Sequence, residues 1–435
     1  MKKTTKGLLL GLCMTLTLSM SPVFSASAAP QAQPKAKYSE AQVLDYGKWA
    51  PRNYEVVQNL INENGVKSKS YNPGKKPYAV FDWDNTSIMN DTEEALLVYQ
   101  MNNLMFKMTP EEFEKAIRTN VPAGPFSDDF KTVDGKKVIF DDVVADVVSD
   151  YTYIYNHYKG LKGSESLETV TNTDQFQDFR AKMFFMYEAI NGTHGNAVGY
   201  HWVLYLFDNM TVDEVQKMAE KSDDYALGNA IHTLTWTSPE SMKGKAGVVT
   251  VEHVTGIRMT TEIRNLMNTL RSNGIDVYVV SASLEEVVEV FASNPKYGYS
   301  LPKENVIGMR LAMDAEGKFM PKAKDNWFLT VSHGKTEVIK DQIAKTHGGA
   351  GPLLIGGDSK GDYEMMTEFP DTKLRLIVNR VSGGTIGKAS TLAAEQMKQP
   401  QPQFILQGRD ENTGEWRPSE ETIKLGKTEP QLLKK

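Results

Sequence analysis

Residues Ala79–Asp91 read AVFDWDNTSIMND, and this stretch decides the predicted fold. Three apolar residues are followed by Asp82 and Asp84, which stand two positions apart. A short apolar run bounded by turn residues is typical of a buried strand, and the turn cluster Asn72–Pro77 comes just before it. Two carboxylates directly after a buried strand indicate a functional site at the carboxyl end of that strand.

The same arrangement recurs in the second half of the chain. Ser281 follows the apolar run VYVV, and Asp358 and Asp362 lie in GDSKGD after LLIG. Lys335 lies at the start of a helical pattern, HGKTEVIK. Helical patterns alternate with these apolar runs, which predicts an α/β fold with a parallel sheet. In such a sheet the carboxyl ends of the strands open on one crevice, so we expect these polar residues to meet there.

The chemistry of these side chains favours phosphoryl transfer. Several carboxylates at one crevice repel each other, and a divalent cation relieves the repulsion; an all-oxygen ligand set suits Mg²⁺. One carboxylate can attack phosphorus, and a second can pass a proton to the leaving oxygen. A lysine and a hydroxyl can hold the transferring group and balance its charge. Phosphoryl transfer depends mainly on positioning and electrostatics, so this set of groups is sufficient.

Together the residues resemble the four ordered motifs of the haloacid dehalogenase-like phosphohydrolases: Asp82-x-Asp84-x-Thr86, Ser281, Lys335 and Gly357-Asp358-x-x-x-Asp362. One such motif alone is a weak signal, whereas four in order, three of them after apolar strands, are specific. The resemblance implies a Rossmann-like parallel-sheet core and an enzyme that hydrolyses phosphate monoesters.

The resemblance also assigns roles to these residues. It implies that Asp82 is the nucleophile and Asp84 the general acid and base. It implies phosphate binding by Thr86, Ser281 and Lys335. It further implies one Mg²⁺ held by Asp82, by the backbone carbonyl of Asp84 and by Asp358, with Asp362 supporting the metal or Lys335.

The segment between the first and second motifs has mostly helical patterning and resembles a type-1 cap of this superfamily. We therefore predict a signal peptide at residues 1–28 and a flexible leader at 29–37. The catalytic core comprises residues 38–90 and 255–398, and the helical cap comprises residues 91–254. Residues 399–435 form a C-terminal extension of unassigned role. Such caps close over the site and contact the leaving group.

Longer stretches resemble secreted bacterial phosphorylcholine phosphatases within the same superfamily. They include AVFDWDNTS with DTEEALL, and the run that begins NGIDVYVVSASLEEVVEVFAS. Glu93 and Glu94 follow the nucleophile by about ten residues and are candidates to bind a cationic leaving group. Aromatic faces also bind quaternary ammonium groups, and the segments Asp150–Tyr158 and Tyr200–Phe207 supply them. The alternative for these aromatics is an ordinary hydrophobic core.

The N-terminus has the pattern of a secretory signal. Three lysines precede the apolar run GLLLGLCMTLTL, and Ala26-Ser27-Ala28 fits a cleavage site. We predict an exported bacterial protein without a stable membrane anchor; the alternative is an uncleaved anchor. Cys13 is the only cysteine and lies in the signal, so the mature chain has no thiol nucleophile.

The formal net charge of −6 gives no support for a nucleic-acid partner, so the expected partner is a small phosphate ester. Two alternatives stay open for the activity. The first is a broad-specificity acid phosphatase or a phosphoserine-type phosphatase with the same core. The second is a catalytically inactive module that binds phosphate or choline.

Overall fold

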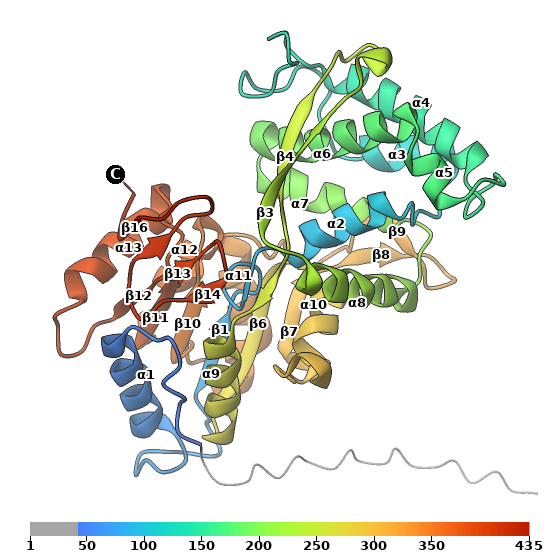
Figure 1. Cartoon of the computed structure of the whole chain (residues 1–435). Helices are drawn as coiled ribbons and strands as arrows, with labels where there is room; N and C mark the ends of the chain where they lie inside the picture. Colours follow the sequence, from blue (N-terminus) through green and yellow to red (C-terminus); the bar gives the residue numbers. More distant parts are fainter. Residues whose placement is uncertain (1–41, 435) are drawn as a thin grey trace, which may run out of the picture. The chain divides into compact units, whose positions relative to one another are not determined.

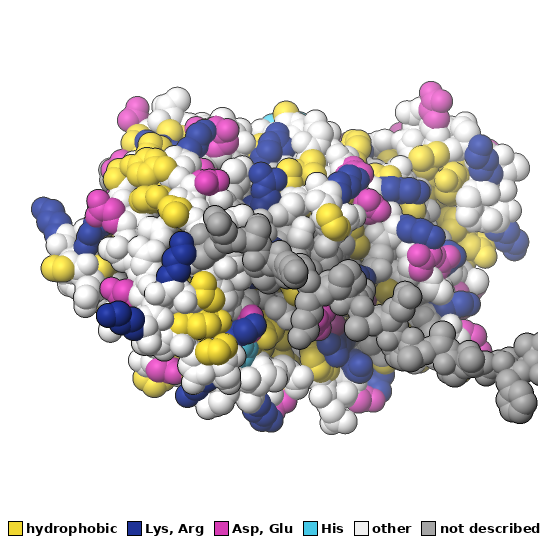
Figure 2. All heavy atoms as spheres, turned by 90° about the horizontal axis from the view of Figure 1, so that it is seen from below, with side chains coloured by type: hydrophobic (Ala, Val, Ile, Leu, Met, Phe, Trp, Pro, Cys, Tyr) yellow, Lys and Arg dark blue, Asp and Glu magenta, His cyan; other side chains and the backbone are white. Residues whose placement is uncertain are grey.

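The computed structural model describes residues 42–434. The predicted signal peptide, the leader and Ser39, the expected N-cap of the first helix, lie outside the described residues. Within residues 42–434 no helix is both long and apolar enough to cross a bilayer. On the face drawn in Figure 2, basic and acidic side chains are interspersed, and no basic patch stands out beyond the grey atoms.

A six-stranded parallel sheet forms the centre of the catalytic core (Figure 1). Its strands, in spatial order, are β12 (Phe404–Gln407), β11 (Leu374–Val378), β10 (Leu354–Gly357), β1 (Tyr78–Phe81), β6 (Asp276–Leu284) and β7 (Val306–Met309). The parallel α/β prediction is therefore confirmed. Strand β12 lies in the predicted C-terminal extension, so the predicted end of the core at residue 398 is wrong: the sheet continues beyond it.

Helices cover both faces of this sheet because its strands are apolar on both sides. On β1, Ala79 and Phe81 pack against one set of helices, and Tyr78 and Val80 pack against the other. The first set is α1 (Pro51–Asn64), α9 (Thr261–Ser272) and α10 (Glu285–Ser293). The second set is α11 (His333–Val338), α12 (Tyr363–Thr367) and α13 (Gly384–Gln396).

Helix α1 begins later than the sequence pattern suggested. The pattern predicts a helix from Ser39, but residues 42–50 are not helical and α1 starts at Pro51. Pro51 occupies the first turn, where its missing N–H costs nothing. Gly47, at φ +45°, bends the chain just before it.

The cap is a second layer with its own hydrophobic core (Figure 1). Its helices are α2 (Thr92–Asn102), α3 (Pro110–Arg118), α4 (Phe140–His157), α5 (Leu167–Thr171), α6 (Asp174–His194), α7 (Asn196–Leu204) and α8 (Val212–Gly228). Thr109 caps α3 and forms a capping box with Glu112. The mostly helical cap is thus observed, with one hairpin that the pattern did not reveal, β3 (His232–Thr237) with β4 (Thr250–Thr255).

A short strand pairing and a hairpin connect the catalytic core with the cap. Strands β2 (Ile88–Met89) and β5 (Arg258–Met259) pair where the chain leaves the core for the cap and where it returns. The hairpin β8 (Leu311–Met313) with β9 (Phe319–Ala323) also contributes to the cap core, through Leu311 and Phe319. The C-terminal segment forms a small sheet of β13 (Arg409–Asp410), β14 (Glu415–Trp416), β15 (Thr422–Ile423) and β16 (Pro430–Gln431).

Candidate active site

Asp82 is the first residue after β1 and lies at the carboxyl edge of the sheet. One carboxylate oxygen, Oδ1, accepts a hydrogen bond from the Lys335 ammonium group. The other, Oδ2, accepts from the Thr86 hydroxyl at 3.1 Å. The Ser87 hydroxyl donates to the Asp82 carbonyl oxygen at 2.6 Å, which fixes the loop after the strand. The side chain is therefore held from both sides and points into the site.

Thr86 lies behind the catalytic carboxylates. It is completely buried and does not line the catalytic pocket. Its hydroxyl lies 2.8 Å from Asp358 Oδ1 as well as 3.1 Å from Asp82 Oδ2, so it connects two carboxylates. The phosphate-binding role of Thr86 stays a prediction, and its observed contacts are with the acidic groups.

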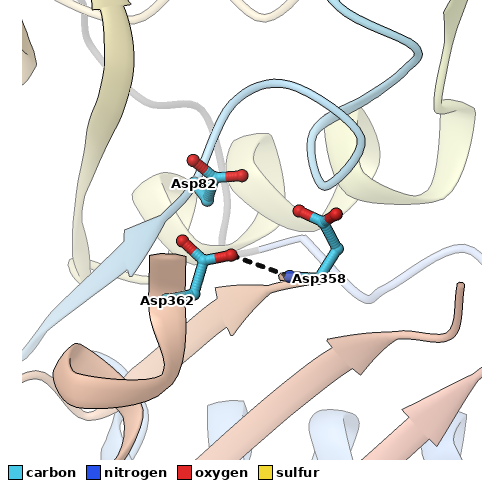
Figure 3. A group of neighbouring side chains, drawn as sticks. All are labelled: Asp82, Asp358 and Asp362. Carbon is cyan, nitrogen blue, oxygen red and sulfur yellow. Dashed lines mark hydrogen bonds between the residues drawn. The ribbon is translucent and has the colours of Figure 1, made fainter. Parts of the chain in front are cut away.

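Three buried carboxylates, from Asp82, Asp358 and Asp362, converge at one point (Figure 3). One oxygen from each lies within 4.8 Å of the others. Burial and the nearby charge of Asp362 raise the pKa of Asp82 well above its usual range, although Lys335 opposes this shift. The charges of Asp362 and Asp82 raise the pKa of Lys335 against the effect of burial, so the lysine is charged. This dense set of oxygen donors fits a hard divalent cation.

Asp362 is the most fully bonded member of this triad. Its Oδ1 accepts from Lys335 at 2.7 Å, and its Oδ2 accepts from the Asp358 backbone N–H at 3.1 Å. Ser359 adds bonds from its backbone N–H and its hydroxyl, both at 3.0 Å. Asp362 therefore orients Lys335 and the loop that carries Asp358. Of its two predicted roles, support of Lys335 and of the metal site, the first is directly visible in these contacts.

Asp84 lies beside the triad but its side chain is not part of it. Its Oδ1 accepts two hydrogen bonds from Thr92, one from the backbone N–H at 2.7 Å and one from the hydroxyl at 2.8 Å. Its Oδ2 accepts from the Ser283 hydroxyl at 2.7 Å. Burial raises the pKa of Asp84 despite these bonds. Because Thr92 is the first residue of α2, the first helix of the cap holds this carboxylate.

Ser281 and Lys335 both line the pocket that contains Asp82. Ser281 lies within β6 and accepts a hydrogen bond from the Ser283 backbone N–H at 3.1 Å. Its own hydroxyl hydrogen has no acceptor within residues 42–434, so it is free to bind a ligand. Lys335 projects from α11, after a turn in which Ser332 has a φ of 52°. All four predicted motifs therefore meet at one site.

The catalytic pocket has a volume of about 90 Å³. Its core side supplies the residues above together with Asn85 and Arg380, whose guanidinium donates to Asp358 Oδ2 at 2.9 Å. Its cap side is formed by Asp91, Glu93, Tyr187, Asn196, Tyr200 and Val203. The cap thus closes the pocket with two acidic and two aromatic side chains.

The two predicted leaving-group residues separate in space. Glu93 reaches the catalytic pocket; its Oε2 accepts from the Leu284 backbone N–H at 3.1 Å, and its buried Oε1 has no partner within residues 42–434. Glu94 lines a neighbouring cavity instead. Of the aromatic segments that the sequence highlighted, Tyr200 lines the pocket, whereas Tyr151 is stacked on Phe113 in the cap core.

Two known proteins are similar to this chain over most of its length. No family model matches it. A solved structure of a conserved protein of unknown function from Anaerococcus prevotii is 33% identical, with a TM-score of 0.81 over 88% of this chain and 98% of that one. Phosphorylcholine phosphatase from Pseudomonas aeruginosa is 25% identical over 378 residues, which is 79% of this chain and 84% of that protein. The four ordered motifs and their meeting at the carboxyl edge of a parallel sheet resemble the haloacid dehalogenase-like phosphohydrolases.

Several pocket residues do not follow from the sequence motifs, among them Arg380, Ser283, Asp91 and Tyr187. Arg380 follows β11 by two residues, so the strand-end rule that found Asp358 also applies to it. Ser283 stands two residues after Ser281, and both side chains line the pocket. Asp91 and Tyr187 carried no comparable signal, because a helical pattern does not show which part of a cap faces the core.

The C-terminal segment supports the loop that carries the two carboxylates. Arg409 is buried, and its guanidinium donates to the Asn85 backbone carbonyl at 3.1 Å and to Asn85 Oδ1 at 3.2 Å. Asn85 directly follows Asp84 and has a left-handed conformation, with φ 62°. Glu411 pairs with Arg409 at 3.0 Å and with Lys424 at 2.7 Å. Lys424 donates to the Arg380 carbonyl at 3.1 Å. The segment that had no assigned role thus contacts two loops of the site.

Replacing Arg409 by Met is expected to lower kcat for p-nitrophenyl phosphate by as much as about 10²-fold, because small displacements of catalytic groups are that costly. KM should change by less than about threefold, since Arg409 does not line the pocket. Steady-state kinetics with a thermal melt measures both effects. Arg417→Met, directly after β14, is the matched control, because its guanidinium donates to the Glu421 backbone carbonyl at 2.8 Å and forms no bond with Asn85. Equal kcat losses in the two variants would contradict a positioning role.

Proposed function

We propose that this protein is a Mg²⁺-dependent phosphomonoesterase that forms an aspartyl phosphate on Asp82 and acts on phosphorylcholine or a similar small phosphate ester. The observation that carries the proposal is that acidic and tyrosine side chains of the cap line the same pocket as Asp82 and Asp84. The named relative is a phosphorylcholine phosphatase, which supports the same substrate class.

In the first half of the reaction, an Asp82 carboxylate oxygen attacks phosphorus and the bond from phosphorus to the leaving oxygen breaks. In this proposal Ser281 and Lys335, which line the same pocket as Asp82, hold the phosphoryl oxygens and balance their charge. Asp84 gives its proton to the leaving oxygen. Since both hydrogen bonds from Thr92 occupy Oδ1, we assign the proton to Oδ2, whose partner is the rotatable hydroxyl of Ser283.

In the second half, the roles of Asp84 reverse. Its carboxylate accepts a proton from water while the water oxygen attacks the phosphorus of the aspartyl phosphate. The bond from phosphorus to the Asp82 oxygen breaks, and inorganic phosphate leaves. The Asp82 carboxylate is restored, with Lys335 as its counter-ion.

Asp82 and Asp358 would hold Mg²⁺, with Asp362 orienting Asp358 and Lys335 around it. When bound, the ion supplies positive charge to a phosphoryl oxygen as that oxygen gains charge in the transition state. The raised pKa of Asp82, caused by burial and then by Asp362, supports this assignment, because a cation would offset both effects.

The proposed leaving group is cationic because acidic groups exceed basic ones around the cap side of the pocket. Burial raises the pKa of Glu93 to about 8 and that of Glu94 to about 7, and burial with the charge of Asp84 raises the pKa of Asp91. Tyr187 and Tyr200 lie beside these acids. A quaternary ammonium group adds positive charge, needs no hydrogen bond and packs on aromatic faces, so it matches this environment.

The alternatives use the same core with a different leaving group. A phosphoserine-type or broad-specificity phosphatase would need little from the acidic cluster. A catalytically inactive binding module is disfavoured, because the nucleophile, the second carboxylate, Lys335 and the acidic triad are all in place. Export remains a prediction from residues 1–28.

The experiment that tests the proposal compares phosphorylcholine, phosphoserine and p-nitrophenyl phosphate, with Mg²⁺ and after chelation, in the native protein and in Glu94→Gln. Glu94 is chosen because its side chain forms no hydrogen bond within residues 42–434, whereas Asp91 caps α2 and Glu93 bonds Leu284. Loss of one negative charge near an ammonium group should raise KM for phosphorylcholine on the order of tenfold.

KM for the other two substrates should change by less than about twofold. Chelation should abolish hydrolysis of all three substrates, and adding Mg²⁺ should restore it. Glu111→Gln, an exposed change on cap helix α3, is the control. A uniform rise in KM across the three esters would argue against the cationic leaving group. Full activity without a divalent cation would remove the metal from the proposal.

A further inference from the structure

A second cavity adjoins the catalytic pocket on the cap side. It has a volume of about 360 Å³, against about 90 Å³ for the catalytic pocket. The two share Asn85, Asp91 and Arg380 as lining residues, so they are neighbours across these side chains. The rest of the larger cavity, here called the chamber, is lined by side chains of α2, α6, α8 and the β3–β4 hairpin, among them Tyr99, Arg180, Tyr225, Trp236 and His253.

Arg180 brings an unmatched positive charge to this chamber. Its guanidinium lies over the Trp236 ring, 4.6 Å from the ring centroid, and donates to Gln177 Oε1 at 2.6 Å. Its Nε is buried and has no hydrogen-bond partner within residues 42–434. Within the same residues no carboxylate lies at ion-pair distance from it. Asp91 and Glu94 also line the chamber, but neither is paired with Arg180. A partly buried guanidinium without an ion-pair partner is costly, so Arg180 itself has an unmet requirement for an anionic partner.

His253 provides a second polar group that lacks a partner. It lies on β4, is 4% exposed, and its ring packs against Trp236 with centroids 4.1 Å apart. Its Nε2 has no partner within residues 42–434. Burial and the adjacent charge of Arg180 lower the pKa of His253 to about 4, so the ring is neutral and has one N–H. Nε2 can donate to an anion in the tautomer that carries the proton there. The unpaired Arg180 guanidinium and an unpartnered histidine nitrogen therefore line one cavity.

Trp236 gives this pair its geometry. The indole contacts Arg180 on one side and His253 on another, and Phe184 packs edge-on against it at 5.7 Å. Stacking on an aromatic face restricts the plane of a guanidinium and leaves its N–H edge free for planar, bidentate contact with an oxyanion. The chamber thus holds a preoriented cationic group, separated from the catalytic pocket by Asp91 and Arg380.

We propose that the chamber binds an oxyanion, a carboxylate or a phosphate, carried at the far end of the leaving group, with Arg180 as its counter-ion. This inference rests on the proposed function, because it requires the phosphoryl group of the same molecule to lie at Asp82. It extends the substrate class to phosphate monoesters whose alcohol part ends in a second anionic group. Phosphorylcholine, which has no such group, would occupy only the part nearest the catalytic site.

The test uses two esters of equal length: the phosphate monoester of an ω-hydroxycarboxylic acid and the monoester of its primary amide. The native protein should have a higher kcat/KM for the carboxylate ester. Arg180→Gln should lower that value on the order of tenfold to hundredfold, as expected for loss of a hydrogen bond to a charged group. In this variant, kcat/KM for the amide ester and for p-nitrophenyl phosphate should stay within about twofold of the native values. Arg180→Lys should keep part of the preference.

Arg118→Gln is the matched control, because this cap arginine is paired with Glu114 and Asp141 away from the chamber. A thermal melt verifies that each variant is folded. If Arg180→Gln does not fold, the comparison is made with Arg180→Lys. Equal losses on the carboxylate and amide esters would overturn the proposal. So would calorimetric binding of free succinate through Arg180 without any preference between the esters.

Failure of the proposed function has a separate signature. If the native protein does not hydrolyse p-nitrophenyl phosphate at all, the phosphatase proposal fails. The leaving-group role of the chamber then fails with it, while succinate binding that is lost in Arg180→Gln would still locate an anion site there.

Discussion

Replacing Asp82 by Asn is expected to reduce kcat for every phosphate ester by roughly 10⁵-fold, the size of loss seen when a covalent nucleophile is removed. The amide cannot attack phosphorus in place of the carboxylate, and its shape is nearly unchanged. The buried lysine beside it keeps a counter-ion, because Lys335 also donates to Asp362 at 2.7 Å. The variant should therefore fold, which separates loss of chemistry from loss of structure.

The measurement is steady-state hydrolysis together with mass spectrometry of acid-quenched protein. In the native protein a phosphoryl group should be found on a peptide that contains residues 79–91, and in the variant it should be absent. Asp341→Asn is the control, because Asp341 is exposed and pairs only with surface groups. Residual activity above about 1% of native, or a phosphoryl group on another residue, would be incompatible with Asp82 as the nucleophile.

Replacing Asp84 by Asn is expected to give a loss that depends on the leaving group. A general acid contributes roughly 10²- to 10⁴-fold, and this should appear in full for phosphorylcholine, whose leaving oxygen needs a proton. For p-nitrophenyl phosphate the leaving anion is stable, so the first half of the reaction should remain fast. The second half should be slow, because no base activates the water.

Stopped-flow absorbance measures this difference directly. The variant should release about one p-nitrophenolate per enzyme in a burst and then turn over slowly, which is the signature of an accumulating covalent intermediate. Ser283→Ala is the companion variant: it removes the partner of Asp84 Oδ2 at 2.7 Å but leaves the carboxylate. We expect a smaller loss there and no burst. A variant at Asp84 that slows both esters equally, without a burst, would show that this residue does not move the proton.

The catalytic core could be predicted from the sequence because its signals are local. An apolar strand followed by polar residues is visible at Asp82, Ser281 and Asp358, and the parallel sheet brings those strand ends together. The same rule does not extend to Thr86, because the direction of its hydroxyl depends on a turn of a few residues rather than on the strand.

The cap residues could not be predicted in the same way. Tyr151 and Tyr187 both lie on cap helices and both belong to the cap core, yet only Tyr187 also lines the pocket. The difference comes from how the cap packs on the core, which no periodicity within one helix contains. The β3–β4 hairpin and strand β12 were missed for a related reason. Whether such a short segment forms a strand depends on the strand it pairs with, which a short apolar run does not reveal.

The C-terminal sheet also has a consequence for shortened forms of the chain. Arg409 and Lys424, which contact Asn85 and the Arg380 loop, follow the last strand of the parallel sheet, which ends at Gln407. A chain cut directly after Gln407 keeps every strand of that sheet but lacks these two contacts. It should therefore bind phosphate esters and turn them over slowly.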